Sequence, residues 1–199
     1  MQEEGYTVIQ ESIERGGKLI CCMAVWKHAS NGNVVLAIKG TSFTNATDLA
    51  NDLAMILGGA ASAAIVQPTL AHAIKLVRDF HVNLVTGHSL GGYMTEILAT
   101  NNNLMGIAFC APGPNGPLIQ LGGRETAGFH NVNFEWDLAG NVHPGVYQHV
   151  QWSIYVGCNG HYTHSITNMV DYFSDKKHIH NGNVQSRSKS YLTGYYYPV

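Results

Sequence analysis

Apolar residues near the start of the chain gather in two short runs. Residues 18–28 (KLICCMAVWKH) and 33–40 (NVVLAIKG) are rich in apolar and β-branched side chains. The segment SNGN at 30–33 lies between them and contains an Asn-Gly pair, which favours a tight turn between antiparallel strands. The pattern predicts a β-hairpin in this part of the chain.

A helical pattern begins at Pro68. In PTLAHAIKLVRDF (68–80), Leu70, Ile74 and Val77 recur at helical spacing, and the charged residues fall on another face. Proline suits the first turn of a helix, because the amide hydrogen that it lacks has no partner there. We therefore predict a helix over 68–80, followed by a short buried strand at 81–85 (HVNLV).

The alternation of strand and helix continues through residue 110. SLGGYMTEILAT (89–100) carries apolar side chains at positions i, i+3, i+4, i+7 and i+8, which predicts a second helix. LMGIAFC (104–110) is a further apolar run, typical of a buried strand. Because strand–helix repeats build parallel sheets, we predict an α/β fold with a mainly parallel sheet covered by helices on both faces.

The second half of the chain has a looser pattern. FHNVNFEW (129–136) and VQWSIYVG (150–157) predict strands, and HSITNMVDYF (164–173) predicts a helix. The aromatic cluster in YLTGYYYPV (191–199) predicts a final segment that packs back as an edge. No repeat or linker interrupts the 199 residues, so we predict one domain over residues 1–199.

Composition and charge narrow the classes of partner. Apolar residues make up 45% of the chain and charged residues 12%, which is typical of a folded domain with a weakly charged surface. The net charge of −2, without a basic block, argues against nucleic acid as a partner. Because neither a signal-peptide pattern nor a membrane-spanning apolar run occurs, we expect a protein that is not transmembrane. It would be cytoplasmic, or exported without a recognisable signal peptide.

The candidate chemistry centres on VTGHSLGG at 85–92. Gly87, Ser89 and Gly91 fit the pattern G-x-S-x-G, and a predicted strand before it and helix after it supply the context that the pattern requires. At such a turn the serine hydroxyl projects from the carboxyl edge of the sheet, and N–H groups at the helix start can stabilise an oxyanion. We therefore predict that Ser89 is a catalytic nucleophile.

A nucleophilic serine needs a histidine base and an acid that orients it, in the chain order serine, acid, histidine for this kind of fold. Asp137 follows the predicted strand at 129–136 and is our candidate acid, with Glu135 as the alternative. His164 immediately precedes the predicted last helix and is our candidate base, with His161 as the main competitor. Spacing alone leaves both alternatives open.

A loop after an earlier strand usually supplies the rest of the oxyanion hole in folds with this nucleophile turn. The segment KGTS at 39–42 ends the apolar run NVVLAI and fits that place. Gly40 permits a close approach of the backbone, and Thr41 offers both an N–H group and a hydroxyl.

Together these segments resemble the class 3 lipase family, the fungal triacylglycerol lipase-like branch of the α/β-hydrolases. The resemblance implies an α/β-hydrolase-like fold, with Ser89, Asp137 and His164 as the catalytic triad and Thr41 with the Leu90 N–H as the oxyanion hole. The segments that carry it follow in the family's order over residues 33–173: VVLAIKGTSF, VTGHSLGGYMTEILA, GIAFCAPGPNG, VNFEWD and HYTHSITNMV.

This chain resembles a short version of that family. The family usually has arginine where Lys39 stands, and the oxyanion loop comes unusually early in the sequence. Residues 52–67 (DLAMILGGAASAAIVQ) lie where such lipases carry a lid, and they are apolar and interrupted by Gly58-Gly59. A mobile lid and a buried helix followed by a tight turn both fit this segment, so both remain open.

We predict a serine hydrolase that needs no cofactor or metal and cleaves carboxylic esters of lipids, acylglycerols or phospholipids, through an acyl-enzyme on Ser89. Such a substrate would bring the protein into contact with a membrane or micelle surface. The alternatives are a short-chain esterase, an acyltransferase using the same triad, and a non-catalytic lipid-binding protein. A metal site at His161, His164, His178 and His180 is a further alternative without an obvious acidic or cysteine partner in the nearby sequence.

Overall fold

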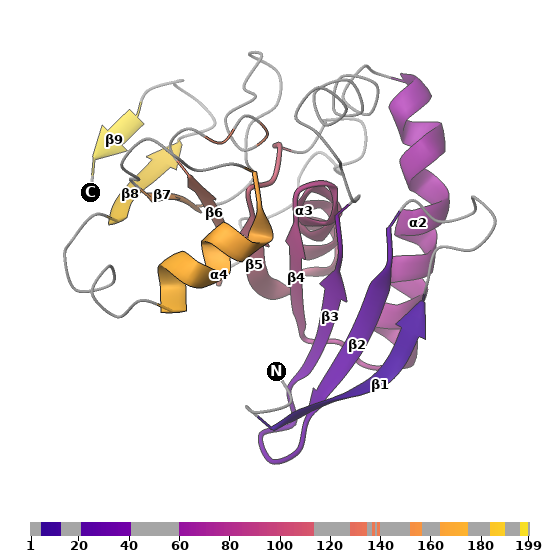
Figure 1. Ribbon diagram of the computed structural model, residues 1–199. Coiled ribbons are helices and arrows are strands. Elements are labelled where there is room, and N and C mark those ends of the chain that lie inside the picture. Colours follow the sequence, from indigo (N-terminus) through magenta and orange to yellow (C-terminus); the bar gives the residue numbers. More distant parts are fainter. Residues whose placement is uncertain are drawn as a thin grey trace.

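In the computed structural model, the described residues form a nine-stranded sheet whose strands lie side by side in chain order (Figure 1). The strands are β1 (Tyr6–Ser12), β2 (Met23–His28), β3 (Val34–Ile38), β4 (Leu84–His88), β5 (Met105–Phe109), β6 (Phe129–Phe134), β7 (Trp152–Val156), β8 (Val184–Lys189) and β9 (Tyr196–Pro198). The helices among the described residues are α2 (Ala60–Asp79), α3 (Leu90–Asn102) and α4 (Ile166–Ser174). The structure describes residues 5–12, 21–40, 60–113, 128–134, 137, 139, 152–156, 164–174, 184–189 and 196–198.

The centre of the sheet is parallel and both margins are antiparallel. Four successive pairings, from β3 with β4 through β6 with β7, are parallel. β1 and β2 continue the sheet antiparallel to β3, and β8 and β9 continue it antiparallel to β7. The mainly parallel sheet is therefore confirmed, and β2 and β3 form the predicted hairpin. In open sheets of this kind, ligands bind beyond the carboxyl ends of the parallel strands.

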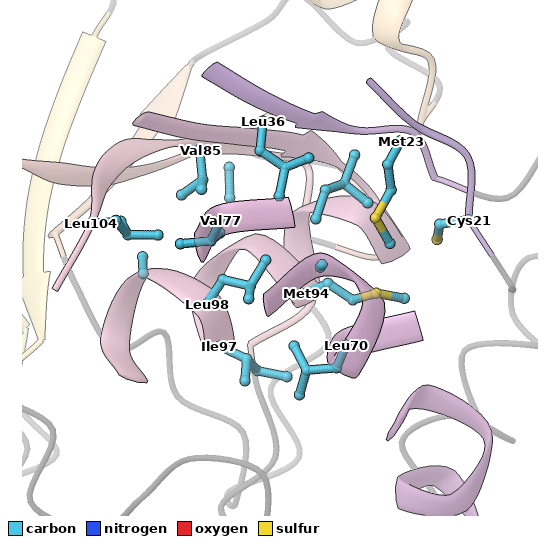
Figure 2. Packing of buried hydrophobic residues seen from close by; sticks show 14 of the residues in the cluster. Cys21, Met23, Leu36, Leu70, Val77, Val85, Met94, Ile97, Leu98 and Leu104 are labelled. Atoms are coloured by element: carbon cyan, nitrogen blue, oxygen red, sulfur yellow. The ribbon is translucent and has the colours of Figure 1, made fainter. Parts of the chain in front are cut away.

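α2 and α3 cover one face of the sheet. Leu36 of β3 and Val85 of β4 lie above Met94 and Leu98 of α3, with Leu70 of α2 beside them (Figure 2). Every described residue of α3 from its start through Thr100 is buried, which explains why this helix has no polar stripe. Because burying each large apolar side chain contributes about 1.5–3 kcal/mol, this cluster holds α3 firmly on the sheet.

α4 lies on the opposite face of the sheet. Its Met169 packs with Val132 and Phe134 of β6. Phe129, at an odd position of the same strand, belongs instead to the core on the α3 side. Side chains alternate between the two faces of a strand, so the two sets of contacts lie on opposite faces. Helices on both faces of the sheet were predicted, and this arrangement is confirmed.

The prediction that a helix begins at Pro68 is wrong, because α2 begins at Ala60 and Pro68 lies inside it. The apolar stripe extends back to Val66, which is fully buried and lies one turn before Leu70. The Pro68 side chain is exposed. The free energy gained by burying the apolar stripe therefore outweighs the loss of the backbone hydrogen bond that proline cannot donate. Residues 60–67 of the candidate lid are thus the first turns of a helix, and residues 52–59 lie outside the described residues.

None of the described helices has both the length and the hydropathy needed to cross a bilayer.

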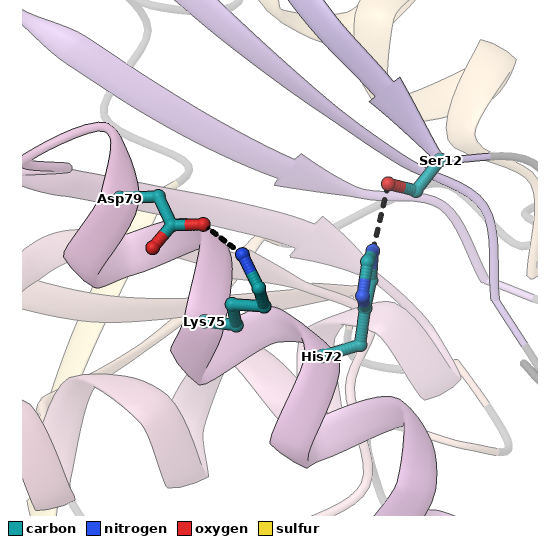
Figure 3. Close-up of polar contacts among 4 residues, drawn as sticks. All are labelled: Ser12, His72, Lys75 and Asp79. Carbon is teal, nitrogen blue, oxygen red and sulfur yellow. Dashed lines mark hydrogen bonds and ion pairs between the residues drawn. The ribbon is translucent and has the colours of Figure 1, made fainter.

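Two strands were not predicted, β1 and β8. β1 exposes most of its residues, and its polar side chains give no apolar alternation from which a strand could be recognised. A hydrogen bond of 2.7 Å between Ser12 of β1 and His72 fastens this edge strand to α2, which also carries the ion pair of Lys75 with Asp79 (Figure 3). The aromatic tail forms β9 at the far edge of the sheet, as predicted.

The position of Pro68 inside α2 predicts the effect of replacing it. Pro68→Ala should raise the free energy of unfolding by about 1–2 kcal/mol, because alanine restores an amide donor and favours the helix interior. Urea denaturation measures this change, with Gln67→Ala at the exposed neighbouring position as the control, expected within about 0.5 kcal/mol of the unchanged protein. A lower stability for Pro68→Ala would contradict an interior position and favour a helix that starts at residue 68.

Candidate active site

The backbone of Ser89 is strained at the junction between β4 and α3. Its dihedral angles are φ 56° and ψ −124°, a region that residues with a side chain rarely adopt. Hydrogen bonds hold it there: the Ser89 N–H donates to the Phe109 carbonyl at 3.0 Å, and the Ser89 carbonyl accepts from the Tyr93 N–H at 2.9 Å. Such strain persists only where the surroundings enforce it, and here it fixes the direction of the serine side chain.

Gly87 and Gly91 make this turn sterically feasible. A methyl group on Gly87 would lie 2.4 Å from the Gly91 carbonyl oxygen, and one on Gly91 would lie 2.2 Å from the Ile38 carbonyl oxygen. Any side chain at either position would therefore push α3 away from β3 and β4. The glycines of the G-x-S-x-G pattern permit the close packing of strand and helix that was expected from the sequence.

The candidate oxyanion hole lies between the end of β3 and the start of α3. A methyl group on Gly40 would lie 3.0 Å from Cβ of Ser89, so the backbone after β3 passes directly beside the serine. Leu90 is buried and is the first residue of α3, where N–H groups have no carbonyl partner within the helix. Thr41 lies outside the described residues, and its predicted role remains a prediction.

Asp137 and His164 form a hydrogen-bonded pair. The Nδ1–H of His164 donates to Oδ2 of Asp137 at 2.8 Å, and the Asp137 side chain is fully buried. The Asp137 N–H donates to the Phe134 carbonyl at 3.1 Å, which fixes the aspartate just beyond the end of β6. The structure therefore brings together the acid and the histidine preferred from the sequence. Their competitors, Glu135 and His161, lie outside the described residues.

The start of α4 holds His164 in place. The Ser165 hydroxyl accepts a hydrogen bond from the Thr167 N–H at 3.3 Å, and the Ser165 carbonyl accepts one from the Met169 N–H at 3.4 Å. These are the contacts of an N-cap residue, so His164 directly precedes a capped helix. The buried side chain of Met169 then anchors that helix to the sheet, which limits the movement of the imidazole.

His88, which directly precedes Ser89 in the chain, lies beside His164. The ring centroids of His88 and His164 are 4.8 Å apart, and His88 is the chain neighbour of Ser89. Oγ of Ser89 and Nε2 of His164 are both buried, and neither has a hydrogen-bond partner among the described residues. A buried hydroxyl and a buried imidazole nitrogen without partners are costly unless they serve a ligand or a reaction.

Solved structures with this architecture include a mutant form of MDLA from Penicillium cyclopium, with a TM-score of 0.55 at 16% identity. A structure described as a fungal lipase also has a TM-score of 0.55, at 14% identity. Each match covers 83% of this chain and 69% of the other chain. The fold is that of a fungal lipase. No protein-family model matches the sequence, and no curated protein sequence matches it.

The α/β-hydrolase-like fold predicted from the lipase resemblance is thus confirmed. At 16% and 14% identity, the likeness extends to the fold alone. Any function of this chain therefore depends on the positions of Ser89, Asp137 and His164 rather than on its fold.

Two residues of the site, His88 and Cys110, were not predicted. Both lie at the ends of parallel strands, His88 at the end of β4 and Cys110 directly after β5. Their place at the carboxyl edge of the sheet was a signal available in the sequence. Burial, together with the nearby His164, lowers the pKa of His88 from 6.5 to about 4, and the Asp137 carboxylate offsets part of that shift.

The low pKa of His88 predicts a loss of stability in acid. As the pH falls below 6.5, the unfolded chain binds a proton at His88 that the folded protein excludes until about pH 4. Between pH 7.5 and pH 5 this group should lower the free energy of unfolding by about 2 kcal/mol. Urea denaturation at both pH values measures the change, and His88→Gln should remove that part of it, whereas His72→Gln should not.

The groups that face His88 are His164, Asp137 and Cys110. An unchanged loss of stability in His88→Gln would contradict the assignment of the acid sensitivity to this imidazole.

Proposed function

We propose that this protein is a serine hydrolase that cleaves carboxylic esters of lipids, acylglycerols or phospholipids, through an acyl-enzyme on Ser89. The observation that carries the proposal is the 2.8 Å hydrogen bond between Asp137 and His164, which leaves the buried Nε2 of His164 as the remaining base of the imidazole. A hydroxyl on a strained turn and a carboxylate-oriented imidazole are the parts that nucleophilic hydrolysis of an ester requires.

In the proposed mechanism, His164 removes the proton of Ser89 as its Oγ attacks the ester carbonyl carbon. Asp137 keeps the imidazole in the tautomer that accepts at Nε2, and it stabilises the imidazolium that forms. The N–H of Leu90 and the backbone and hydroxyl of Thr41 would bind the tetrahedral oxyanion. His164 then donates its proton to the leaving alcohol, and water hydrolyses the acyl-enzyme by the same steps.

Exposed apolar side chains on the helix that follows His164 support a lipid substrate over a polar ester. Ile166 and Val170 are 42% and 55% exposed, and they lie one turn apart on α4, which begins two residues after His164. Apolar residues at positions i and i+4 lie on the same face of a helix. With a charged fraction of only 12%, the chain presents a surface that suits contact with an acyl chain or a lipid interface.

The test of the mechanism is hydrolysis of a series of nitrophenyl esters of increasing chain length, a phospholipid dispersion and a triglyceride emulsion. Ser89→Ala and His164→Gln should each lower kcat/KM by about 10⁴ or more. Asp137→Asn should cost about 10³–10⁴, because it allows the wrong tautomer of His164. Ser30→Ala, at an exposed turn, is the matched control and should keep the full rate. A loss of less than about tenfold in Ser89→Ala would contradict the proposal.

The substrate pattern separates the alternatives. Hydrolysis of long chains and lipid dispersions supports the lipase proposal, whereas hydrolysis of short soluble esters alone would make the protein an esterase. Transfer of the acyl group to an added alcohol in preference to water would make it an acyltransferase. A folded protein that hydrolyses none of these esters would overturn the proposal in favour of a lipid-binding protein.

The exposed apolar face of α4 predicts a selective effect on long chains. Val170→Asp should lower the ratio of long-chain to short-chain kcat/KM by about fivefold to tenfold, because a charge there would meet the acyl chain. Thr167→Asp places the same charge at an exposed position of the same helix and serves as the control. Equal ratios in the two variants would place the acyl chain elsewhere.

A further inference from the structure

Three side chains of the kinds that ligate metals converge among the described residues, and one of them, His164, is the proposed catalytic base. One nitrogen from each of His88 and His164 and the sulfur of Cys110 all lie within 4.8 Å of one another. Cys110 is fully buried, and the side chain of His164 is only 11% exposed. These residues come from the end of β4, from the position after β5 and from the start of α4, so the fold and not the local sequence brings them together.

The donor set matches a thiophilic divalent cation. A thiolate with two imidazoles suits Zn²⁺ and Co²⁺, whereas Mg²⁺ and Ca²⁺ prefer oxygen ligands. Tetrahedral zinc, with bonds of about 2.0 Å to nitrogen and about 2.3 Å to sulfur, places its ligand atoms about 3.3–3.6 Å apart. Side-chain movements of about 1 Å therefore convert the observed cluster into a three-ligand site with one coordination position left for water.

The hydrogen bond between Asp137 and His164 favours metal binding at Nε2 of His164. The Nδ1–H of His164 donates to the Asp137 carboxylate at 2.8 Å, and Nε2 is buried without a partner among the described residues. A carboxylate behind the far nitrogen of a ligating histidine fixes its tautomer and raises its basicity, and this arrangement recurs in protein zinc sites. Nε2 of His88 is likewise buried, with no hydrogen-bond partner among those residues.

We propose that His88, Cys110 and His164 form a binding site for a thiophilic divalent cation of the Zn²⁺ class, and that the bound cation blocks hydrolysis. Binding breaks the S–H bond of Cys110, releases its proton to solvent and forms bonds from the metal to the thiolate and the two neutral imidazoles. Nε2 of His164 donates its lone pair to the bound cation, so this nitrogen can no longer accept the Ser89 proton. The blocking effect rests on the proposed function, whereas the binding itself does not.

The backbone at Cys110 offers a well-matched variant. Its φ of 47° lies in the left-handed region that favours glycine. Cys110→Gly therefore removes the sulfur without adding backbone strain, so the variant is expected to fold. Cys22→Ser removes a thiol outside the cluster and controls for metal binding at other cysteines.

The binding test uses Co²⁺ and Zn²⁺ with the Ser89→Ala protein, in which hydrolysis cannot interfere. Co²⁺ should produce a sulfur-to-metal charge-transfer absorption band that one equivalent of Zn²⁺ removes. Cys110→Gly in the same background should lack this band and weaken Zn²⁺ binding at least tenfold by equilibrium dialysis, whereas Cys22→Ser should retain both.

Three outcomes would overturn the site. They are no Zn²⁺ binding, a band that persists in Cys110→Gly, and binding without any thiolate band, which means adventitious binding to some of the eleven histidines.

The inhibition test compares ester hydrolysis with and without Zn²⁺, each variant being normalised to its own metal-free rate. Zn²⁺ should inhibit the unchanged protein in parallel with Co²⁺ displacement, and Cys110→Gly should need at least tenfold more Zn²⁺ for the same inhibition. Stoichiometric Zn²⁺ binding without inhibition would show that His164 is not a ligand and would overturn the proposal. If the metal-free protein hydrolyses no ester, the proposed function fails, while the charge-transfer band still decides whether the cation site exists.

Discussion

The close contact between the start of α3 and the ends of β3 and β4 is the constraint on which the rest of the site depends. Gly91 lies so near the Ile38 carbonyl that no side chain fits between them, and Gly87 lies equally near the Gly91 carbonyl. This packing forces Ser89 into its strained conformation and brings the first N–H groups of α3 beside the backbone at Gly40. The apolar burial of α3 supplies the free energy that holds the strain.

The two faces of the sheet contribute different parts of the site. The α3 face fixes the serine, whereas the α4 face supplies His164 through a capped helix that Met169 anchors. Asp137, held just beyond the end of β6, accepts the hydrogen bond of His164 at the carboxyl edge of the sheet. The arrangement that orients the His164 imidazole also places His88 and Cys110 within reach of it. The proposed catalytic site and the proposed cation site therefore share the side chain of His164.

Local patterns predicted the parts of the chain whose burial follows a regular period. The hairpin, α3, β5 to β7 and α4 all have apolar residues at the expected spacing, and the G-x-S-x-G turn has the strand and helix that its chemistry needs. The predicted start of α2 was wrong, because proline is typical of the first turn of a helix. Only the burial of Val66, seen in the structure, shows that the helix begins before Pro68 and continues through it. β1 was not predicted, because an exposed edge strand does not need apolar residues at alternate positions. The cluster of His88 and Cys110 with His164 depends on tertiary contacts between residues far apart in the sequence, which no local spacing encodes.

The central claim is that this fold makes Ser89 a nucleophile through His164 and Asp137. Its most direct test is reaction of the folded protein with a fluorophosphonate, followed by mass spectrometry of the intact protein and its peptides. We expect one phosphonyl group per chain, located on Ser89, and loss of labelling when the protein is unfolded or carries His164→Gln. Labelling on another residue, or a folded protein that does not react, would contradict it.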